Sequence, residues 1–420
     1  MREMKDSGIE WIGEIPCDWK LERSQWHLEE VNISNNPIQT NNVLSLTNKL
    51  GVVPYEEKGN QGNKTKENVY EYKLAYPNTI VANSMNILIG SVGLCDYFGC
   101  VSPVYYVFRA KKYNNIKFLN YVFQTVGFQR ELRKYANGIL EIRLRVSSSD
   151  ILKRFIPFPS EIEQQKIADF LDRECGKIDG LKADIQAQID TLEQYKRSVI
   201  TEAVTHGLNP FAPMKDSGAG WMPLIPLHWK ADKLKFHLRQ RGIKNQIDRQ
   251  VLSLYREYGI VPKDSRDDNH NVTSEDVSDY RYVRVGDFVV NKMKAWQGSV
   301  AVSNYEGIVS PAYFVYEFSD DLINKRYFHY LMRNKTYATE FRRLSGGIRE
   351  GQWDLPSEAL NNTIILLPPL DEQQEIADYL DNKCAEIEQI IADKKSQIET
   401  LDGYKKSLIY EYVTGKKEIV

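Results

Sequence analysis

The stretch MKDSGIEWIGEIPCDWK (Met4–Lys20) occurs again as MKDSGAGWMPLIPLHWK (Met214–Lys230) in a chain of 420 residues. The match places Trp19 on Trp229, and residue types this rare do not align by chance over such a stretch. Internal repeats dictate the architecture and are therefore read before any local motif. The sequence predicts two copies of one unit, each beginning with this stretch.

The repeat continues far beyond its opening. GSVGLCDYFGCVSPVYYVF (Gly90–Phe108) aligns with GSVAVSNYEGIVSPAYFVY (Gly298–Tyr316). Its alternating apolar residues, bounded by Gly and Pro, predict strands joined by tight turns. The stretches that follow are typical of an amphipathic helix that ends at Gly138 in the first copy and at Gly347 in the second. The fold class predicted is α+β, with two pseudo-symmetric α/β domains.

The third shared part, Glu163–Thr205 and Glu372–Thr414, predicts two long helices. Ser160 with Glu163, and Asp371 with Gln374, have the spacing of a capping box at a helix start. Apolar residues recur at spacings of three and four, which is typical of a coiled coil. We expect the two helices to pack antiparallel and to bury each other through Leu171, Ile178, Leu181, Ile185, Leu192, Leu380, Ile387, Ile390, Ile398 and Leu401.

These patterns divide the chain into five expected parts. They are a first domain (1–159), a first long helix (160–206), a short linker (207–213), a second domain (214–368) and a second long helix (369–420).

Composition excludes some classes of protein. With 42% hydrophobic and 27% charged residues the chain is globular. No apolar run approaches the length of a membrane span, and the charged N-terminus lacks a signal region, so we expect no membrane partner and a cytoplasmic location. The five cysteines include no C-x-x-C pair, which argues against a disulfide framework or a zinc ribbon.

The net charge of −2 hides an alternation along the chain. The two domains carry +4 and +3, whereas 160–206 and 369–420 carry −4 and −5. Mildly basic domains that alternate with acidic helices are compatible with binding to nucleic acid through the domains.

On the opening stretches, the GSVxxxxxxGxVSPxYxV stretches and the EQQxIADxLD…YKxS helices, the sequence resembles the HsdS-type specificity subunit of Type I restriction–modification systems. The resemblance implies two target-recognition domains, each of which reads one half of a bipartite, asymmetric site in double-stranded DNA. It also implies that the antiparallel helices set the spacer and dock two methyltransferase subunits, through which restriction/translocase subunits attach. Methylation of adenine N6 with S-adenosylmethionine, and the use of ATP and Mg²⁺, are expected in the partner subunits, with no cofactor bound by this chain.

Segments that differ between the two copies are where the two readers would differ. Short loops on a rigid sheet suit base readout, because the scaffold sets their geometry. Amide side chains pair with adenine and Lys or Arg with guanine, whereas Arg133, Lys134, Arg342 and Arg343 are interpreted as phosphate contacts. Trp296 is interpreted as stacking or packing, and each residue also has the simpler interpretation of a solvated surface group. The candidates are Lys64, Lys66, Ser84, Asn86, Arg133, Lys134, Arg143, Arg145, Lys292, Lys294, Trp296, Gln297, Arg342, Arg343, Arg349 and Gln352.

The sequence contains no recognisable catalytic constellation. Adenine methyltransferases use a [DN]-P-P-[YF] clamp, and the nearest match, Asn209-Pro210-Phe211, lacks one proline and lies in the linker. There is no G-x-x-x-x-G-K-[ST] for ATP, and His27 and His237 have no further ligand at metal spacing. We therefore expect a non-catalytic subunit, with a stand-alone DNA-modifying enzyme and a coiled-coil protein scaffold as the alternatives.

Overall fold

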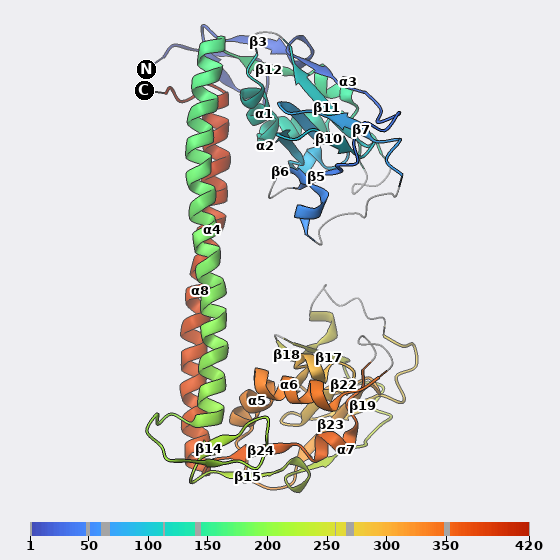
Figure 1. Ribbon diagram of the computed structural model, residues 1–420, viewed down its shortest axis with the longest axis vertical. Helices are drawn as coiled ribbons and strands as arrows, with labels where there is room; N and C mark the ends of the chain where they lie inside the picture. Colours follow the sequence, from blue (N-terminus) through green and yellow to red (C-terminus); the bar gives the residue numbers. More distant parts are fainter. Residues whose placement is uncertain are drawn as a thin grey trace. The chain divides into compact units, whose positions relative to one another are not determined.

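The computed structural model describes residues 2–47, 51–59, 68–111, 114–138, 144–256, 258–265, 273–347 and 353–419. These form two compact units. Unit 1 comprises Met1–Ile185 with Lys395–Val420, and unit 2 comprises Gln186–Lys394. Each unit holds one copy of the repeated domain together with a part of each of the two long helices, which Figure 1 labels α4 and α8.

Unit 1 is built around a four-stranded antiparallel sheet in the order β4-β11-β8-β9. Four two-stranded pairs surround it, namely β1–β2, β3–β12, β5–β6 and β7–β10. Two helices, α1 and α2, follow the sheet in sequence. The elements are β1 (Met4–Asp6), β2 (Glu14–Pro16), β3 (Lys20–Arg23), η1 (Ser24–Trp26), β4 (Leu28–Glu30), β5 (Leu44–Thr47), β6 (Gly51–Pro54), η2 (Tyr55–Lys58), β7 (Lys73–Ala75), β8 (Thr79–Asn83), η3 (Ile87–Ile89), β9 (Val92–Cys95), β10 (Gly99–Val101), β11 (Tyr105–Ala110), α1 (Ile116–Gln124), α2 (Val126–Arg133), α3 (Ser148–Leu152) and β12 (Phe155–Phe158).

Unit 2 repeats this plan strand for strand. Its sheet has the order β16-β23-β20-β21, and its pairs are β13–β14, β15–β24, β17–β18 and β19–β22. The elements are β13 (Met214–Asp216), β14 (Leu224–Pro226), β15 (Lys230–Lys233), η5 (Leu234–Phe236), β16 (Leu238–Gln240), β17 (Leu252–Tyr255), β18 (Gly259–Pro262), η6 (Lys263–Ser265), β19 (Arg281–Val283), β20 (Phe288–Asn291), η7 (Ala295–Gln297), β21 (Val300–Val302), β22 (Gly307–Val309), β23 (Tyr313–Phe318), α5 (Lys325–Arg333), α6 (Lys335–Leu344), α7 (Ser357–Asn361) and β24 (Ile364–Leu367). The predicted duplication and α+β class are confirmed.

One continuous core joins each domain to its share of the long helices. In unit 1 the sheet residue Phe108 and the helix residue Phe123 belong to the same buried cluster as Leu171 of α4 (Glu161–His206) and Leu408 of α8 (Leu370–Val413). Unit 2 has the equivalent cluster, from the sheet through α5 and α6 to both long helices. The domain and the helix pair of each unit therefore fold as one body, because they bury the same apolar surface.

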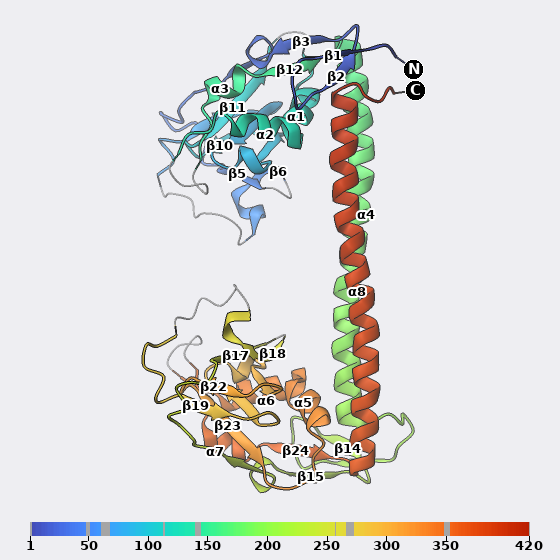
Figure 2. The same ribbon diagram turned by 180° about the vertical axis from the view of Figure 1, so that it is seen from behind.

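The two long helices run antiparallel, side by side in both views (Figures 1 and 2). In unit 1 the ring of Phe170 lies 4.4 Å from that of Tyr412, and Lys405 Nζ lies 2.6 Å from Asp179 Oδ2. As the residue number rises along α4, the number of the contacting residue on α8 falls. The same holds in unit 2, where Lys196 of α4 pairs with Glu388 of α8. The predicted antiparallel coiled coil is confirmed.

The buried seam between the helices differs from the prediction at two positions. Leu181 and Ile390 are 53% and 45% exposed, so their assignment to the interface is wrong. The seam alternates steps of three and four, and from Ile178 it advances four residues to Lys182, not three to Leu181. In α8 the same step places Ile391 in the seam instead of its neighbour Ile390. Of the other expected residues, Leu171, Ile178, Leu380 and Ile387 are buried, and Ile185, Leu192, Ile398 and Leu401 are half-buried.

The helix starts follow the capping-box prediction only in part. The Ser160 hydroxyl accepts the N–H of Glu163 at 3.4 Å, at the start of α4. Glu163 does not return to the cap, because its carboxylate accepts the indole N–H of Trp19 at 3.0 Å. The box predicted from Asp371 is wrong, since α8 begins at Leu370 and Asp371 therefore lies inside the helix.

Among the helices of the described ranges, none combines the length and the apolar character that crossing a bilayer requires.

Two glycines inside the long helices lie at positions where an alanine side chain would contact nothing, so their substitution changes helix propensity without changing packing. A Cβ added at Gly180 or Gly403 meets nothing within 4 Å. We expect Gly180→Ala and Gly403→Ala each to raise the free energy of unfolding by about 0.5–1 kcal/mol, because glycine is entropically unfavourable in a helix interior. Denaturant unfolding monitored by circular dichroism measures this.

The matched control is a glycine that the fold requires. A Cβ at Gly99 would lie 2.6 Å from the carbonyl oxygen of Asn42 and 2.7 Å from Leu44 Cγ. Gly99→Ala should lower stability, and equal effects of all three substitutions would contradict the interpretation.

Candidate nucleic-acid interface

Two divergent loops meet in unit 1. The first loop lies between β8 and β9, and the second loop lies between α2 and α3. The backbone N–H of Val146, just after the second loop, donates to the carbonyl oxygen of Ser84, the first residue of the first loop, at 3.1 Å. Asn137 and Arg145 exchange two backbone hydrogen bonds of 2.8 Å and so close the second loop at its base. One backbone frame thus presents both loops together.

Unit 2 has the same frame. Leu355 N–H donates to the carbonyl oxygen of Lys292 at 2.9 Å, and a bridge between Gly346 and Asp354 closes the second loop. The frame aligns hydrogen bond for hydrogen bond with that of unit 1, although the side chains differ.

Residues shared by the two copies shape the first loop. The buried side chain of Asn83 accepts the backbone N–H of Met85 at 3.0 Å, and Asn291 accepts that of Met293 at 3.1 Å. At the far end Gly90 and Gly298 have φ of 92° and 88°, in the left-handed region that glycine tolerates best. The asparagine and the glycine fix the start and the end of the loop, which leaves the residues between them free to diverge.

The candidate residues of unit 1 differ in availability. Asn86 is exposed within the first loop and Arg145 beside the second, and Arg133 at the end of α2 is exposed but also has a partner within the protein. Lys134 is also exposed, but it pairs with Glu10 at 3.0 Å and Glu131 at 2.9 Å, and these carboxylates raise the pKa of its ammonium. Ser84 is only 4% exposed, because its position in the frame turns its side chain inward. The prediction that this side chain contacts DNA is therefore wrong.

In unit 2, Lys294 and Gln297 are exposed in the first loop. Lys292 pairs with Asp354 at 3.2 Å, across the frame. Arg343 makes two hydrogen bonds of 2.7 Å to the buried Glu340 one turn earlier on α6, so its guanidinium is already engaged. Lys64, Lys66, Arg143, Arg349 and Gln352 lie outside the described residues.

The sequence interpretation missed two features of unit 2. Trp353 contacts Trp296, with ring centroids 5.7 Å apart, and Arg342 lies over both rings. Asp354 supplies the partner of Lys292, at the position where unit 1 has Arg145. The internal alignment could have indicated the ion pair, because Lys292 aligns with Ser84 and Asp354 aligns with Arg145.

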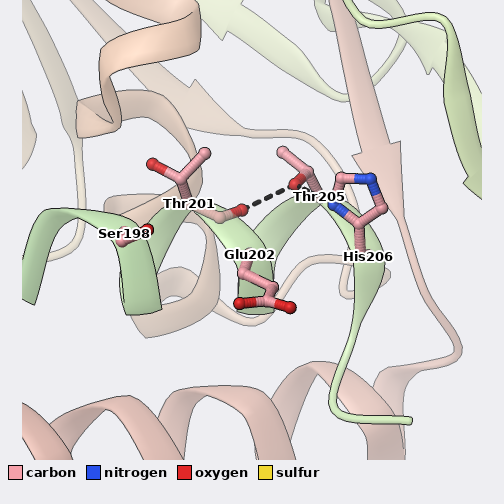
Figure 3. A pocket seen from close by; sticks show the side chains of 5 residues that line it. All are labelled: Ser198, Thr201, Glu202, Thr205 and His206. Carbon is pink, nitrogen blue, oxygen red and sulfur yellow. Dashed lines mark hydrogen bonds between the residues drawn. The ribbon is translucent and has the colours of Figure 1, made fainter. Parts of the chain in front are cut away.

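Two hollows in the described part of the chain lie away from these loops. The first hollow lies in unit 2 and has a volume of about 300 Å³ (Figure 3). It is lined by Ser198, Thr201, Glu202, Thr205 and His206, and the Thr205 hydroxyl donates to the Thr201 carbonyl oxygen. The aligned residue of Thr201 in unit 1 is Tyr410, whose hydroxyl donates to the carbonyl oxygen of Ile12 at 3.2 Å. We attribute the hollow to the smaller side chain in unit 2.

A second hollow, also of about 300 Å³, lies in unit 1 between α1 and the long helices. Part of its polar lining is paired internally, since Asp172 accepts hydrogen bonds from both Lys117 and Tyr121 at 2.7 Å. Within the described ranges, no group of three or more His, Cys, Asp or Glu residues is placed to hold a metal ion.

Two copies of one domain, each presenting a different pair of polar loops from the same frame, define a duplicated recognition protein. A family model described as Type I restriction modification DNA specificity domain matches residues 27–191 and 244–400. The chain belongs to this family of type I restriction–modification DNA specificity proteins.

Solved structures share the fold along nearly the whole chain. One, concerned with complex assembly and conformational transition of the type I R-M system, is similar with a TM-score of 0.67 and 12% identity, over 96% of this chain and 99% of that one. The HsdS subunit from Thermoanaerobacter tengcongensis is similar with a TM-score of 0.50 and 14% identity, over 96% of this chain and 98% of its own. At such identities the likeness shows the fold.

The engagement of the basic side chains predicts which of them bind phosphate. We expect Lys294→Ala to weaken DNA binding by a similar factor for all sequences and to lower the slope of log K against log salt by about 0.9, because one released counterion is lost. Lys230 on β15, an exposed lysine at the strand pair that leads into α8, supplies the matched control Lys230→Ala. Titration of the assembled complex against duplex DNA at several salt concentrations measures the slopes, and equal slopes for the two variants would contradict the assignment.

Proposed function

We propose that the chain is a DNA sequence-specificity subunit in which each unit reads one half of a bipartite, asymmetric site. The observation that carries this is the shared frame, in which the bonds Val146–Ser84 and Leu355–Lys292 present loops of different chemistry. A scaffold kept in duplicate while its loops diverge fits two readers of one ligand type with different sequence preferences.

The difference in chemistry between the loops supports an asymmetric site. Among the exposed side chains, unit 1 offers an amide, Asn86, and a guanidinium, Arg145, whereas unit 2 offers an amide, Gln297, beside Lys294, which is predicted to contact phosphate. Amides suit adenine, and cationic donors suit guanine or phosphate. Because side chains differ at aligned positions, the two units are not expected to select the same bases.

The helix pair is proposed to set the spacer between the half-sites. The helices α4 and α8 have 46 and 44 residues without interruption. At about 1.5 Å per residue, such helices are roughly 69 and 66 Å long. Mutual burial along the seam makes them stiffer than either helix alone, which is what a fixed spacing requires.

The same helices are proposed to dock two adenine-N6 methyltransferase subunits, one on each unit, and restriction/translocase subunits through them. The support is an exposed apolar pair that recurs in each unit. Leu181 and Tyr404 of unit 1 are 53% and 55% exposed, and Ile390 and Tyr195 of unit 2 are 45% and 49% exposed. Each of these four residues directly precedes a residue of the buried seam. In two antiparallel helices, residues at this position lie on the same side of the helix pair, so the two members of each exposed pair are neighbours.

The exposed apolar pair occurs at the same positions in both copies of the repeat, which favours a shared role in docking over chance exposure. Leu181 aligns with Ile390, and Tyr195 aligns with Tyr404, so the apolar character is kept at both positions of both copies. A partner that covers these half-exposed side chains removes their remaining apolar surface from water, which contributes about 1 kcal/mol per side chain. Two equal sites imply two copies of the partner.

The proposed division of reading predicts the outcome of a domain exchange. Replacing residues 214–368 with the corresponding segment of another family member should change one half of the recognised sequence and leave the other half intact, because each unit has its own core and frame. Mapping N6-methyladenine in DNA modified by the complex measures this. A change in both halves would refute independent readers.

The docking proposal predicts stoichiometry. Leu181→Glu with Tyr404→Glu should reduce the bound methyltransferase subunits from two to one, since a buried unpaired carboxylate is strongly unfavourable. The four-residue variant that adds Tyr195→Glu and Ile390→Glu should bind none. Native mass spectrometry of the complex counts the subunits.

Aligned small residues supply the control for docking. Ala187 and Ser396 are exposed and occupy the same repeat position, opposite the seam. Ala187→Glu with Ser396→Glu should retain both subunits, and retention by the four-residue variant as well would place docking elsewhere.

A further inference from the structure

Two indole rings meet between the two loops of unit 2. Trp296 lies on η7 in the first loop, and Trp353 directly precedes Asp354, the residue that closes the second loop. Their ring centroids are 5.7 Å apart, with planes inclined at 60°, and both side chains are half-buried. The indole N–H of Trp296 donates to the Met293 carbonyl oxygen at 3.0 Å, so this ring's polar group is satisfied internally and what it offers to a ligand is apolar.

A guanidinium from a third element lies against both rings. Arg342 Cζ on α6 is 5.9 Å from the Trp296 ring and 5.8 Å from the Trp353 ring. Contacts of this length are at the outer limit of a cation–π interaction. They nevertheless place a cationic group at the border of the indole pair, where a phosphate contact would orient DNA against it.

The fold does not require the indoles. In unit 1 the same frame carries Leu88 and Leu144 at the aligned positions, and Leu88 packs against the buried core. Since leucines suffice there, the larger aromatic surface in unit 2 is a property of that unit alone. Trp296 directly precedes Gln297, which the proposed function assigns to base reading.

We propose, resting on the proposed function, that Trp296 and Trp353 form an apolar contact for the C5-methyl group of a thymine in the half-site read by unit 2. In the major groove the thymine methyl is the only apolar group that the four base pairs present, and protein recognises it by apolar contact. Two rings held at an angle by a hydrogen bond and by each other are preorganised for such a contact at little cost in side-chain entropy. The second half-site therefore contains an A·T pair whose thymine methyl is read.

Deoxyuridine scanning tests this at the level of one methyl group. The complex of the full chain with its methyltransferase subunits is bound to duplexes that carry its own site, which is first identified by N6-methyladenine mapping. Each thymine of the second half-site, on either strand, is then replaced in turn by deoxyuridine, which differs only by lacking that methyl. One replacement should weaken binding about fourfold, the value of one buried methyl group.

The variant Trp296→Leu with Trp353→Leu gives unit 2 the side chains that unit 1 uses in the same frame. It should bind the thymine duplex more weakly than the original chain and lose the difference between thymine and deoxyuridine. Leu88→Ala with Leu144→Ala in unit 1 is the matched control and should leave that difference intact. An unchanged circular dichroism spectrum and a cooperative thermal unfolding transition show that each variant is folded.

Three results would overturn the proposal. They are a second half-site without A·T pairs, no effect of any deoxyuridine in the original chain, and an equal effect in the Trp→Leu variant. The last would mean that the indoles stiffen the loops without touching the methyl. Failure of the proposed function is distinguishable, because the complex would then select no DNA sequence at all, whereas failure of this inference alone leaves selection intact.

Discussion

The start of each long helix is locked to its domain by one carboxylate and one buried amide, and the remaining structure depends on this lock. In unit 1 Glu163 accepts the indole N–H of Trp19 at 3.0 Å, while Gln164, fully buried, accepts the N–H of Asn115 and donates to the Pro159 carbonyl oxygen, both at 3.0 Å. Unit 2 repeats it with Glu372 and Gln373 in place of Glu163 and Gln164. A buried amide left without partners costs about 1–3 kcal/mol, so the helix, the opening stretch and the first domain helix hold one arrangement.

The lock explains why the opening stretch and the EQQ sequence are shared by the two copies. Both fix the domain on its helix, through Trp19 on one side and through Glu163 and Gln164 on the other. With that geometry secured, the structural role of the first loop rests on the asparagine at one end, the glycine at the other and the core residue between them, Ile87 in unit 1 and Ala295 in unit 2. Ser84 and Lys292 can therefore replace each other while the carbonyl oxygen of each accepts the same hydrogen bond. Side chains in the loops can therefore change with little loss of stability, because the hydrogen bonds of the frame join backbone groups.

Comparison of sequence and structure shows which features local patterns can predict. The duplication, the strands and the antiparallel helices were predictable because repeats and periodicity are properties of many residues at once. Leu181 and Ile390 were misplaced because a single step of three or four decides the face, and apolar character alone favoured the exposed residue over Lys182. The burial of Ser84 and the contact of Trp296 with Trp353 depend on segments far apart in the chain, which no local pattern encodes.

Lysines in the seam form ion pairs that join the two helices. Lys405 pairs with Asp179 in unit 1, and Lys196 pairs with Glu388 in unit 2, and these two pairs occupy the same repeat positions. A partly buried ammonium without a carboxylate is unfavourable, so a shift of one helix along the other would separate both pairs together. Hydrophobic contact makes the helices associate, but it is nearly indifferent to a shift by one heptad. A shift by one heptad in one direction would offer these two lysines new carboxylates, Asp172 and Asp381, but it would also move Lys182 from Asp402 to Lys395. The three ion pairs together therefore favour the observed register, and a fixed register is the condition under which the helix pair can act as a spacer.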